Sequence, residues 1–332
     1  MKLKLSRRRF LGTVALAGAA FRGPLNLALA ADAPKAHTPS AETIPVIDTH
    51  IHLYDPFRPQ GVPWPGPENQ ALYQTSLPAR YRPIAQPLGI VGAIEVECSS
   101  WLEDNQWVLD VAAKEDIMVG TIGHLEPGTP EFRPSLDQFQ KNRLFRGIRY
   151  GLGRQAGKEL DRPEFITDLK ALADANLVLD TANPSVSLLA DVVRLSDRVP
   201  QLRIIIDHLP QLDPPTDPAA RTSYEASLKA IRNRPRIFVK ISEVLRRVDG
   251  HIPTDLDFYR PRLDGILEVF GTDRVLFGSD WPNSDQWLPV PVGFKLVQEY
   301  FLGLGRPAAE KFFWRNSVNC YQWVRRTASQ PT

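Results

Sequence analysis

Short apolar runs rich in β-branched residues recur along the chain, and longer amphipathic stretches separate them. Most of these runs are continuously apolar rather than alternating, which is typical of parallel strands that are covered on both faces. The pattern predicts eight strands, at Ile44–His52, Ile90–Glu97, Ile117–Leu125, Phe145–Tyr150, Leu177–Thr181, Leu202–His208, Arg236–Ser242 and Arg274–Asp280.

Several of the intervening stretches carry apolar residues at helical spacing. Trp107, Val108 and Val111, for example, fall on one face of a helix. The predicted helices are Glu103–Lys114, Arg162–Ala175, Ser187–Ser196, Ser223–Arg232 and Tyr259–Phe270.

The alternation of strands and helices predicts the fold. Eight strand–helix units favour an α/β protein, a (β/α)8 TIM barrel that forms one domain at residues 44–332, because such barrels take about 250 residues. We expect Tyr54–Pro87, which is rich in prolines and aromatic residues, to be a long loop after the first strand, over the mouth of the barrel. We expect closing helices at Leu296–Val324.

Residues 1–30 resemble a twin-arginine signal peptide. The basic and apolar motif is Ser6-Arg7-Arg8-Arg9-Phe10-Leu11. The apolar stretch that follows is shorter than the roughly 20 residues a membrane span needs, and Ala28-Leu29-Ala30 fits a small-residue cleavage site. Cleavage near Ala30 would leave a flexible linker at residues 31–43, and no later segment is apolar enough to span a membrane. We therefore expect the twin-arginine export machinery as a partner and a periplasmic location, with an uncleaved anchor as the alternative.

Composition excludes several classes of protein. With 332 residues, 43% hydrophobic and 23% charged, the chain is neither disordered nor collagen-like. Its net charge of +2 comes from the leader, since the rest holds 34 basic against 38 acidic residues. Nucleic-acid binding therefore lacks electrostatic support.

The chain has two cysteines, Cys98 and Cys320. They could pair in an oxidising periplasm, but nothing in the sequence brings them together, so we expect two small buried apolar side chains. The sequence does not fix an oligomeric state, and a homo-oligomer stays open.

Two histidines end the first predicted strand. Asp48, His50 and His52 alternate along it, so all three are expected to face the same way. Two imidazoles at this spacing can reach one cation from a single strand. Both lie at the carboxyl end of the strand, where barrels of this kind build their active sites.

Two more candidates end later strands. His208 follows the sixth apolar run and Asp280 ends the eighth, with Gly278 leaving room beside it. Three imidazoles and a carboxylate that converge on a barrel mouth suit one divalent metal ion, and this ligand set favours zinc. Asp280 could equally take a proton from water, and His208 could polarise a carbonyl.

Cationic and polar residues are expected around this centre as substrate contacts. Arg149, Lys240 and Ser242 face the mouth by strand parity and suit a carboxylate or a developing oxyanion. Ion pairs with Asp48 or Glu97 are the alternative for the two cations. His124, at the end of the third strand, and Trp281 are further candidates for lining the pocket.

Together these motifs resemble the amidohydrolase superfamily, in its amidohydrolase-related (family 2) branch of lactonases and metal-dependent decarboxylases. The resemblance spans about residues 44–324. It rests on Asp48-x-His50-x-His52, Asp207-His208, Gly278-Ser279-Asp280-Trp281-Pro282, Phe145-Arg146-Gly147-Ile148-Arg149, Val239-Lys240-Ile241-Ser242, Glu103-Asp104-Asn105 and Asn316-Ser317-Val318-Asn319-Cys320-Tyr321. It implies His50, His52, His208 and Asp280 as the metal-type set.

Two departures from the superfamily pattern bear on the metal. Binuclear members use a lysine on strand four and a histidine on strand five, where this chain has Arg149 and Leu177-Val178-Leu179-Asp180-Thr181. A single ion is therefore expected. The branch that the chain resembles also contains lactonases that are active without added metal.

The resulting hypothesis is a hydrolase that opens a lactone, or a similar cyclic ester, of a small carboxylate-bearing molecule derived from a sugar acid or an aromatic compound. The first alternative is non-oxidative decarboxylation of an unsaturated or aromatic acid, which uses the same ligand set. The second is a periplasmic binding protein on an enzyme-like barrel.

Overall fold

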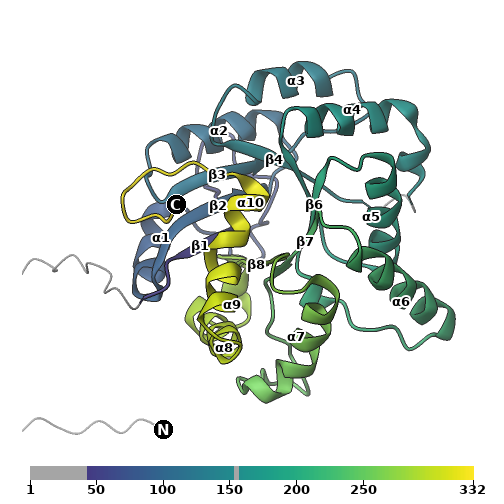
Figure 1. The fold of residues 1–332 in the computed structure, drawn as a ribbon. Coiled ribbons are helices and arrows are strands. Elements are labelled where there is room, and N and C mark those ends of the chain that lie inside the picture. Colours follow the sequence, from purple (N-terminus) through teal and green to yellow (C-terminus); the bar gives the residue numbers. More distant parts are fainter. Residues whose placement is uncertain (1–42, 153–156) are drawn as a thin grey trace, which may run out of the picture. The chain divides into compact units, whose positions relative to one another are not determined.

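Eight parallel strands form one sheet in the computed structural model, which describes residues 43–152 and 157–332. The strands follow in chain order, and a parallel bridge between Ile51 and Trp281 joins the two ends into a nearly closed barrel (Figure 1). The predicted (β/α)8 barrel is confirmed. The strands are β1 (Val46–Ile51), β2 (Ile90–Val96), β3 (Met118–Gly123), β4 (Phe145–Tyr150), β5 (Val178–Thr181), β6 (Arg203–Ile206), β7 (Ile237–Ile241) and β8 (Val275–Phe277).

Helices follow the strands and cover the outside of the barrel (Figure 1). Short 3₁₀ turns occur at Gln86–Leu88, Lys158–Asp161, Leu209–Gln211 and Asn283–Gln286, and a π-helical turn at Lys311–Arg315. The α-helices are α1 (Pro78–Ala85), α2 (Leu102–Ala113), α3 (Phe132–Phe139), α4 (Pro163–Asp174), α5 (Val186–Arg198), α6 (Pro218–Arg232), α7 (Leu256–Phe270), α8 (Val290–Gly303), α9 (Arg306–Glu310) and α10 (Asn316–Tyr321).

The strands are buried on both faces, as their continuous apolar pattern predicts. One cluster, including Ile47, Ile94 and Ile205, fills the barrel, while a larger one lies between strands and helices. A layer architecture of this kind leaves the ends of the strands as the place where polar side chains can gather.

The five predicted helices are all present, with no end shifted by more than five residues. The predicted long loop at Tyr54–Pro87 is present up to Leu77, and α1 then forms despite Pro83. Helix α3 was not predicted at all. The predicted closing helices correspond to part of α8 and to α9 and α10.

A C-terminal strap, residues 322–332, lies across the amino ends of β2 and β3. The Val324 N–H donates to the Val119 carbonyl, and the Gln330 side-chain amide donates to the carbonyls of Val91 and Asp116. Gln330 is only 1% exposed. The strap therefore covers the end of the barrel opposite to the carboxyl ends of the strands.

The predicted signal peptide, and the linker apart from Thr43, lie outside the described residues. Among the helices that the structure describes, none combines the length and the apolar character needed to cross a membrane.

Candidate active site

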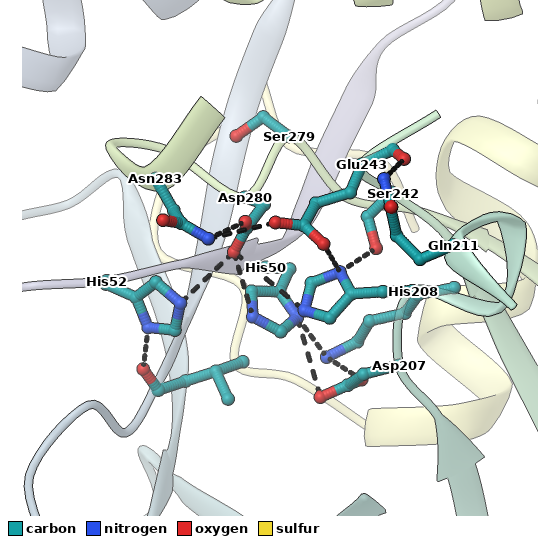
Figure 2. A network of polar contacts seen from close by, with 12 residues as sticks. His50, His52, Asp207, His208, Gln211, Ser242, Glu243, Ser279, Asp280 and Asn283 are labelled. Atoms are coloured by element: carbon teal, nitrogen blue, oxygen red, sulfur yellow. Dashed lines mark hydrogen bonds and ion pairs between the residues drawn. The ribbon is translucent and has the colours of Figure 1, made fainter. Parts of the chain in front are cut away.

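His50, His52, His208 and Asp280 meet at the carboxyl ends of β1, β6 and β8. The nearer carboxylate oxygen of Asp280, Oδ1, lies 3.1 Å from His52 Nε2, 3.4 Å from His50 Nε2 and 4.0 Å from His208 Nε2 (Figure 2). Four residues that are far apart in the sequence thus surround one point, as expected from their strand positions.

Hydrogen bonds at the other ring nitrogen orient two of the imidazoles. His52 Nδ1 lies 2.6 Å from the Val96 carbonyl, which can only accept, so Nδ1 carries the proton and Nε2 presents its lone pair to Asp280. His208 Nδ1 contacts Ser242 Oγ at 2.8 Å. Burial lowers the pKa of His52 to about 4, so the ring is neutral near pH 7.

Asp280 is held rigidly by backbone and side-chain contacts. Its N–H donates to the His50 carbonyl, and Asn283 Nδ2 donates to its Oδ2 at 2.8 Å. Like His208 and Glu243, it has a positive φ, a conformation that is costly for these residue types and aims the side chain back over the barrel. Burial raises the pKa of the Asp280 carboxyl to about 6.

Glu243, directly after β7, was not predicted as part of the site. Its Oε1 accepts a hydrogen bond from Asn283, and its side chain also hydrogen-bonds Asp280. Burial and the neighbouring Asp280 raise the pKa of Glu243 to about 9, so at neutral pH it is protonated and donates to Asp280. An acid that follows an apolar strand is the signal that could have found it, as it found Asp280.

The prediction that Asp48 faces the same way as His50 and His52 was wrong. Its carboxylate accepts a hydrogen bond from the Tyr81 hydroxyl of α1 at 2.6 Å and from the Ser279 N–H at 2.9 Å. The pairing of β1 with β2 is irregular between Asp48 and Ile51, which breaks the strict alternation of faces. Asp48 thus supports the turn that carries Asp280.

Lys240 and Arg149 form ion pairs with acids inside the barrel. Lys240 Nζ lies 2.5 Å from Asp180 and 3.1 Å from Asp207, and Arg149 Nε lies 3.3 Å from Asp207. Burial by itself would lower the pKa of Lys240, but these two carboxylates raise it above its ordinary value. Asp180 and Asp207 are thus partners that the sequence did not indicate, while the expected partner Glu97 lies close enough to Arg149 to help raise the pKa of its guanidinium.

A cavity of about 580 Å³ lies above this centre. Of the predicted site residues, His52, His208 and Asp280 form part of its lining, as do Arg149 and His124. The other residues that line it are Trp64, Glu97, Cys98, Glu126, Tyr150, Gly151, Glu159, Ala182, Asn183 and Asn283.

Three predicted substrate contacts do not line this cavity. Lys240 and Trp281 are fully buried, and Trp281 packs against Tyr81 with ring centres 5.1 Å apart. Ser242 is 1% exposed and serves His208 instead. Lys240, Ser242 and Trp281 therefore lie at the expected end of the barrel but outside the lining of this cavity.

The site fits one divalent ion. His52 Nε2 and Asp280 Oδ1 are both acceptors at 3.1 Å, so a proton or a cation has to lie between them. His50 Nε2 is buried without a hydrogen-bond partner and lies 3.4 Å from Asp280 Oδ1, while its other ring nitrogen, Nδ1, lies 3.2 Å from the Lys240 ammonium. His50, His52 and Asp280 offer ligand atoms that all lie within 4.8 Å of one another.

The cysteines are both free, with Cys320 buried and Cys98 partly buried. The expectation of unpaired cysteines is confirmed for the structure, while Cys98 is less buried than expected because it reaches the edge of the cavity.

Comparisons with known proteins agree with this geometry. The L-fucono-1,5-lactonase of Burkholderia ambifaria is 25% identical over 239 residues, which cover 72% of this chain and 80% of the relative. A zinc-bound amidohydrolase of Burkholderia multivorans shares the fold with a TM-score of 0.74 at 21% identity, over 84% of this chain and 99% of the other. The 5-carboxyvanillate decarboxylase of Sphingomonas paucimobilis gives a TM-score of 0.60 at 13% identity, over 85% and 100%. A family model described as amidohydrolase matches residues 47–323, nearly the whole barrel, and the chain therefore belongs to the amidohydrolase family.

Proposed function

We propose that this protein is a lactonase that hydrolyses the cyclic ester of a small, hydroxyl-rich lactone. The observation that carries the proposal is the position of Asp280, which lies at the floor of a 580 Å³ cavity with three imidazoles around one of its oxygens. The similarity to an L-fucono-1,5-lactonase over most of both chains supports the same reaction class.

Asp280 acts as the general base. It accepts a proton from a water molecule on the cavity side, and the water oxygen forms a bond to the lactone carbonyl carbon. The ring C–O bond then breaks, and the proton held on Asp280 passes to the departing ring oxygen. The products are a carboxylic acid and a hydroxyl group on one open chain, so atoms and charges balance.

The neighbouring side chains prepare the base and the carbonyl. Protonated Glu243 and Asn283 hydrogen-bond Asp280 and keep it ionised and fixed in direction. Arg149, whose side chain is 14% exposed, presents a cation to the cavity that can stabilise the developing oxyanion.

A divalent ion held by His50, His52, His208 and Asp280 would polarise the carbonyl and lower the pKa of water towards about 7. We propose zinc as this ion, because imidazole and carboxylate ligands in a compact set suit it. Elemental analysis of the purified protein tests the assignment, and a preparation that is fully active with another metal and no zinc would contradict it.

The lining of the cavity favours a hydroxyl-rich substrate. Asn183 and Tyr150 offer hydrogen bonds to hydroxyl groups, and Glu126 adds an acceptor. Lys240, one of the two cations assigned to a substrate carboxylate, is buried below the cavity, and Arg149 already pairs with Asp207. A neutral sugar-derived lactone therefore suits the cavity better than a substrate with several carboxylates.

A panel of 1,4- and 1,5-lactones of sugar acids, assayed by acid release with and without chelator, tests this proposal. Aromatic carboxylic acids, assayed in parallel for carbon dioxide release, test the decarboxylase alternative that the fold shared with 5-carboxyvanillate decarboxylase keeps open. Acid release from at least one lactone, without carbon dioxide release, is the expected result. Carbon dioxide release with no lactone opening would replace the proposal by the alternative.

We further propose that the twin-arginine machinery exports the folded protein to the periplasm. The support is the leader motif around Arg7 and Arg8 with a cleavage site near Ala30. Changing both residues, Arg7→Lys and Arg8→Lys, should leave full-length precursor in the cytoplasm, as shown by fractionation and intact mass. Normal processing of this variant would contradict the proposal.

A further inference from the structure

The polar centre contains more than one position where a cation could sit. Three overlapping sets of side chains each offer ligand atoms within 4.8 Å of one another: His50 with His52 and Asp280, His208 with Glu243 and Asp280, and His50 with Asp207 and His208. The first two share Asp280, which lines the cavity. The third depends on Asp207, which is completely buried and does not line the cavity.

A cation of the protein itself already lies beside this third set. Lys240 Nζ is 2.5 Å from Asp180 Oδ2, 3.1 Å from Asp207 Oδ1 and 3.2 Å from His50 Nδ1. Two carboxylate oxygens and an imidazole nitrogen are also a ligand set that divalent metals accept. The ammonium group thus contacts two members of the third set, His50 and Asp207, together with Asp180.

The charges around Lys240 are also balanced. Asp180 and Asp207 are the acids that it contacts, and Asp207 has Arg149 as a second cationic partner at 3.3 Å. Tyr321, from α10, donates hydrogen bonds to both oxygens of Asp180 at 3.0 and 3.1 Å. A further divalent ion at this depth would meet an ammonium and a guanidinium that already pair with Asp180 and Asp207.

We propose that Lys240 permanently occupies the inner cation position of this site and so limits the protein to a single divalent ion, at the cavity. Lys240 is a positioning residue in this role, because it lies below the cavity and touches the ligands rather than the substrate. The inference concerns ion content and does not depend on which ester the site opens.

Removing the ammonium should convert the inner position into a metal site. In Lys240→Met the side chain keeps much of its length but loses its charge, and Asp180 and Asp207 are left as buried carboxylates with too little compensation. The variant should then bind one Zn²⁺ more per chain than the wild type, and zinc should raise its thermal unfolding midpoint by more than it raises that of the wild type.

Two matched variants make the test specific. Lys240→Arg keeps a cation at the position and should retain the wild-type stoichiometry. The double variant Lys240→Met/Asp180→Asn removes one ligand of the vacated position and should lose the additional ion. The readout is zinc per chain, measured by elemental analysis after chelator treatment and equilibrium dialysis against Zn²⁺.

The proposal is supported if Lys240→Met gains one ion and the double variant loses it again. It is also supported if Lys240→Met folds only when zinc is present in the growth medium. It is overturned if wild-type protein binds two ions, if folded Lys240→Met gains none, if the double variant keeps the extra ion, or if zinc fails to rescue an unfolded Lys240→Met.

Discussion

The chemistry of the site depends on which nitrogen of each imidazole carries a proton. The Val96 carbonyl fixes the proton of His52 on Nδ1, so its Nε2 can only accept a proton or a metal ion. His208 Nδ1 is held by the Ser242 hydroxyl, which can donate or accept, and both imidazole side chains are buried. In the proposed mechanism the histidines serve as neutral ligands or acceptors, and Asp280 takes the proton from water.

The pH dependence of the reaction follows from Asp280. Burial raises the pKa of its carboxyl to about 6, and only the ionised form can accept a proton. The value of kcat/KM should fall about tenfold per pH unit below this pKa and be level above it. A bound divalent ion would move this acid limb of the pH profile to lower pH. A pH profile of kcat/KM checks this, and a limb above about 7 would contradict it.

The hydrogen bond from Glu243 to Asp280 should shift the pH at which this acid limb lies. Glu243→Ala removes a donor that favours ionised Asp280 and should move the acid limb up by about one pH unit. Glu243→Gln keeps a donor and is the matched control, with a limb within a few tenths of a unit of the wild type. Equal shifts in the two variants would mean that Glu243 acts through packing rather than through this bond.

The sequence predicted the residues that directly follow long apolar strands, and it missed those placed by irregular backbone. His50, His52, His208 and Asp280 could be found because the end of a parallel strand faces the mouth of the barrel whatever its neighbours are. Asp48 was misplaced because the irregular pairing of β1 is a tertiary effect that alternation cannot show. The depth of Lys240 also depends on strand stagger, which parity alone does not give.

At the scale of elements, the barrel was predictable while the structure of its longest connection was not. Most of the strands are shorter than predicted at one or both ends. In β6 and β8, the residues that follow the strand leave the ladder and form the site. Helices α1 and α3 each span only eight residues and contain prolines, which hides them in the sequence although Phe132, Leu136 and Phe139 of α3 do share one face. Their formation relies on packing against the barrel.

Helix α1 supports the site from behind. Tyr81 is fully buried and its hydroxyl donates to Asp48, which in turn accepts the Ser279 N–H just before Asp280. Tyr81→Phe should lower the free energy of unfolding by about 1–3 kcal/mol, because a buried carboxylate loses a donor. Chemical denaturation measures this change.

The control for this variant is Tyr73→Phe in the same connection. Among the described residues, none hydrogen-bonds the Tyr73 hydroxyl. The free energy of unfolding of Tyr73→Phe should therefore stay within about 0.5 kcal/mol of that of the wild type. If the two variants were equally stable, the Tyr81–Asp48 bond would have no role in supporting the turn.

At the scale of the whole barrel, function and closure lie at opposite ends. The cavity and its ionisable groups occupy the carboxyl ends of the strands, while the C-terminal strap closes the amino ends of β2 and β3. Such separation lets loops around the mouth vary without loss of the fold. Substitutions in the strap should therefore change the stability of the barrel without changing its activity.

Gln330 tests this separation. Gln330→Ala removes a buried side-chain amide that donates to the part-buried carbonyls of Val91 and Asp116 and should lower the free energy of unfolding by about 1–3 kcal/mol. The kcat of the folded protein should not change. Ser329→Ala, at an exposed position of the strap, is the matched control and should change neither quantity. A fall in kcat for Gln330→Ala without unfolding would show that the two ends are coupled.

The most direct test of the whole account is the rate at which Asp280→Asn opens a lactone that the wild type hydrolyses. The amide keeps the shape and a contact to Asn283 but cannot accept the proton of water, so kcat should fall by about 10²- to 10⁴-fold while circular dichroism and the unfolding midpoint still report a folded barrel. Asp285→Asn, which changes an acid of the same turn outside the cavity lining, should keep wild-type kcat. If folded Asp280→Asn retained kcat within about tenfold of the wild type, Asp280 would not be the base and the proposed mechanism would be wrong.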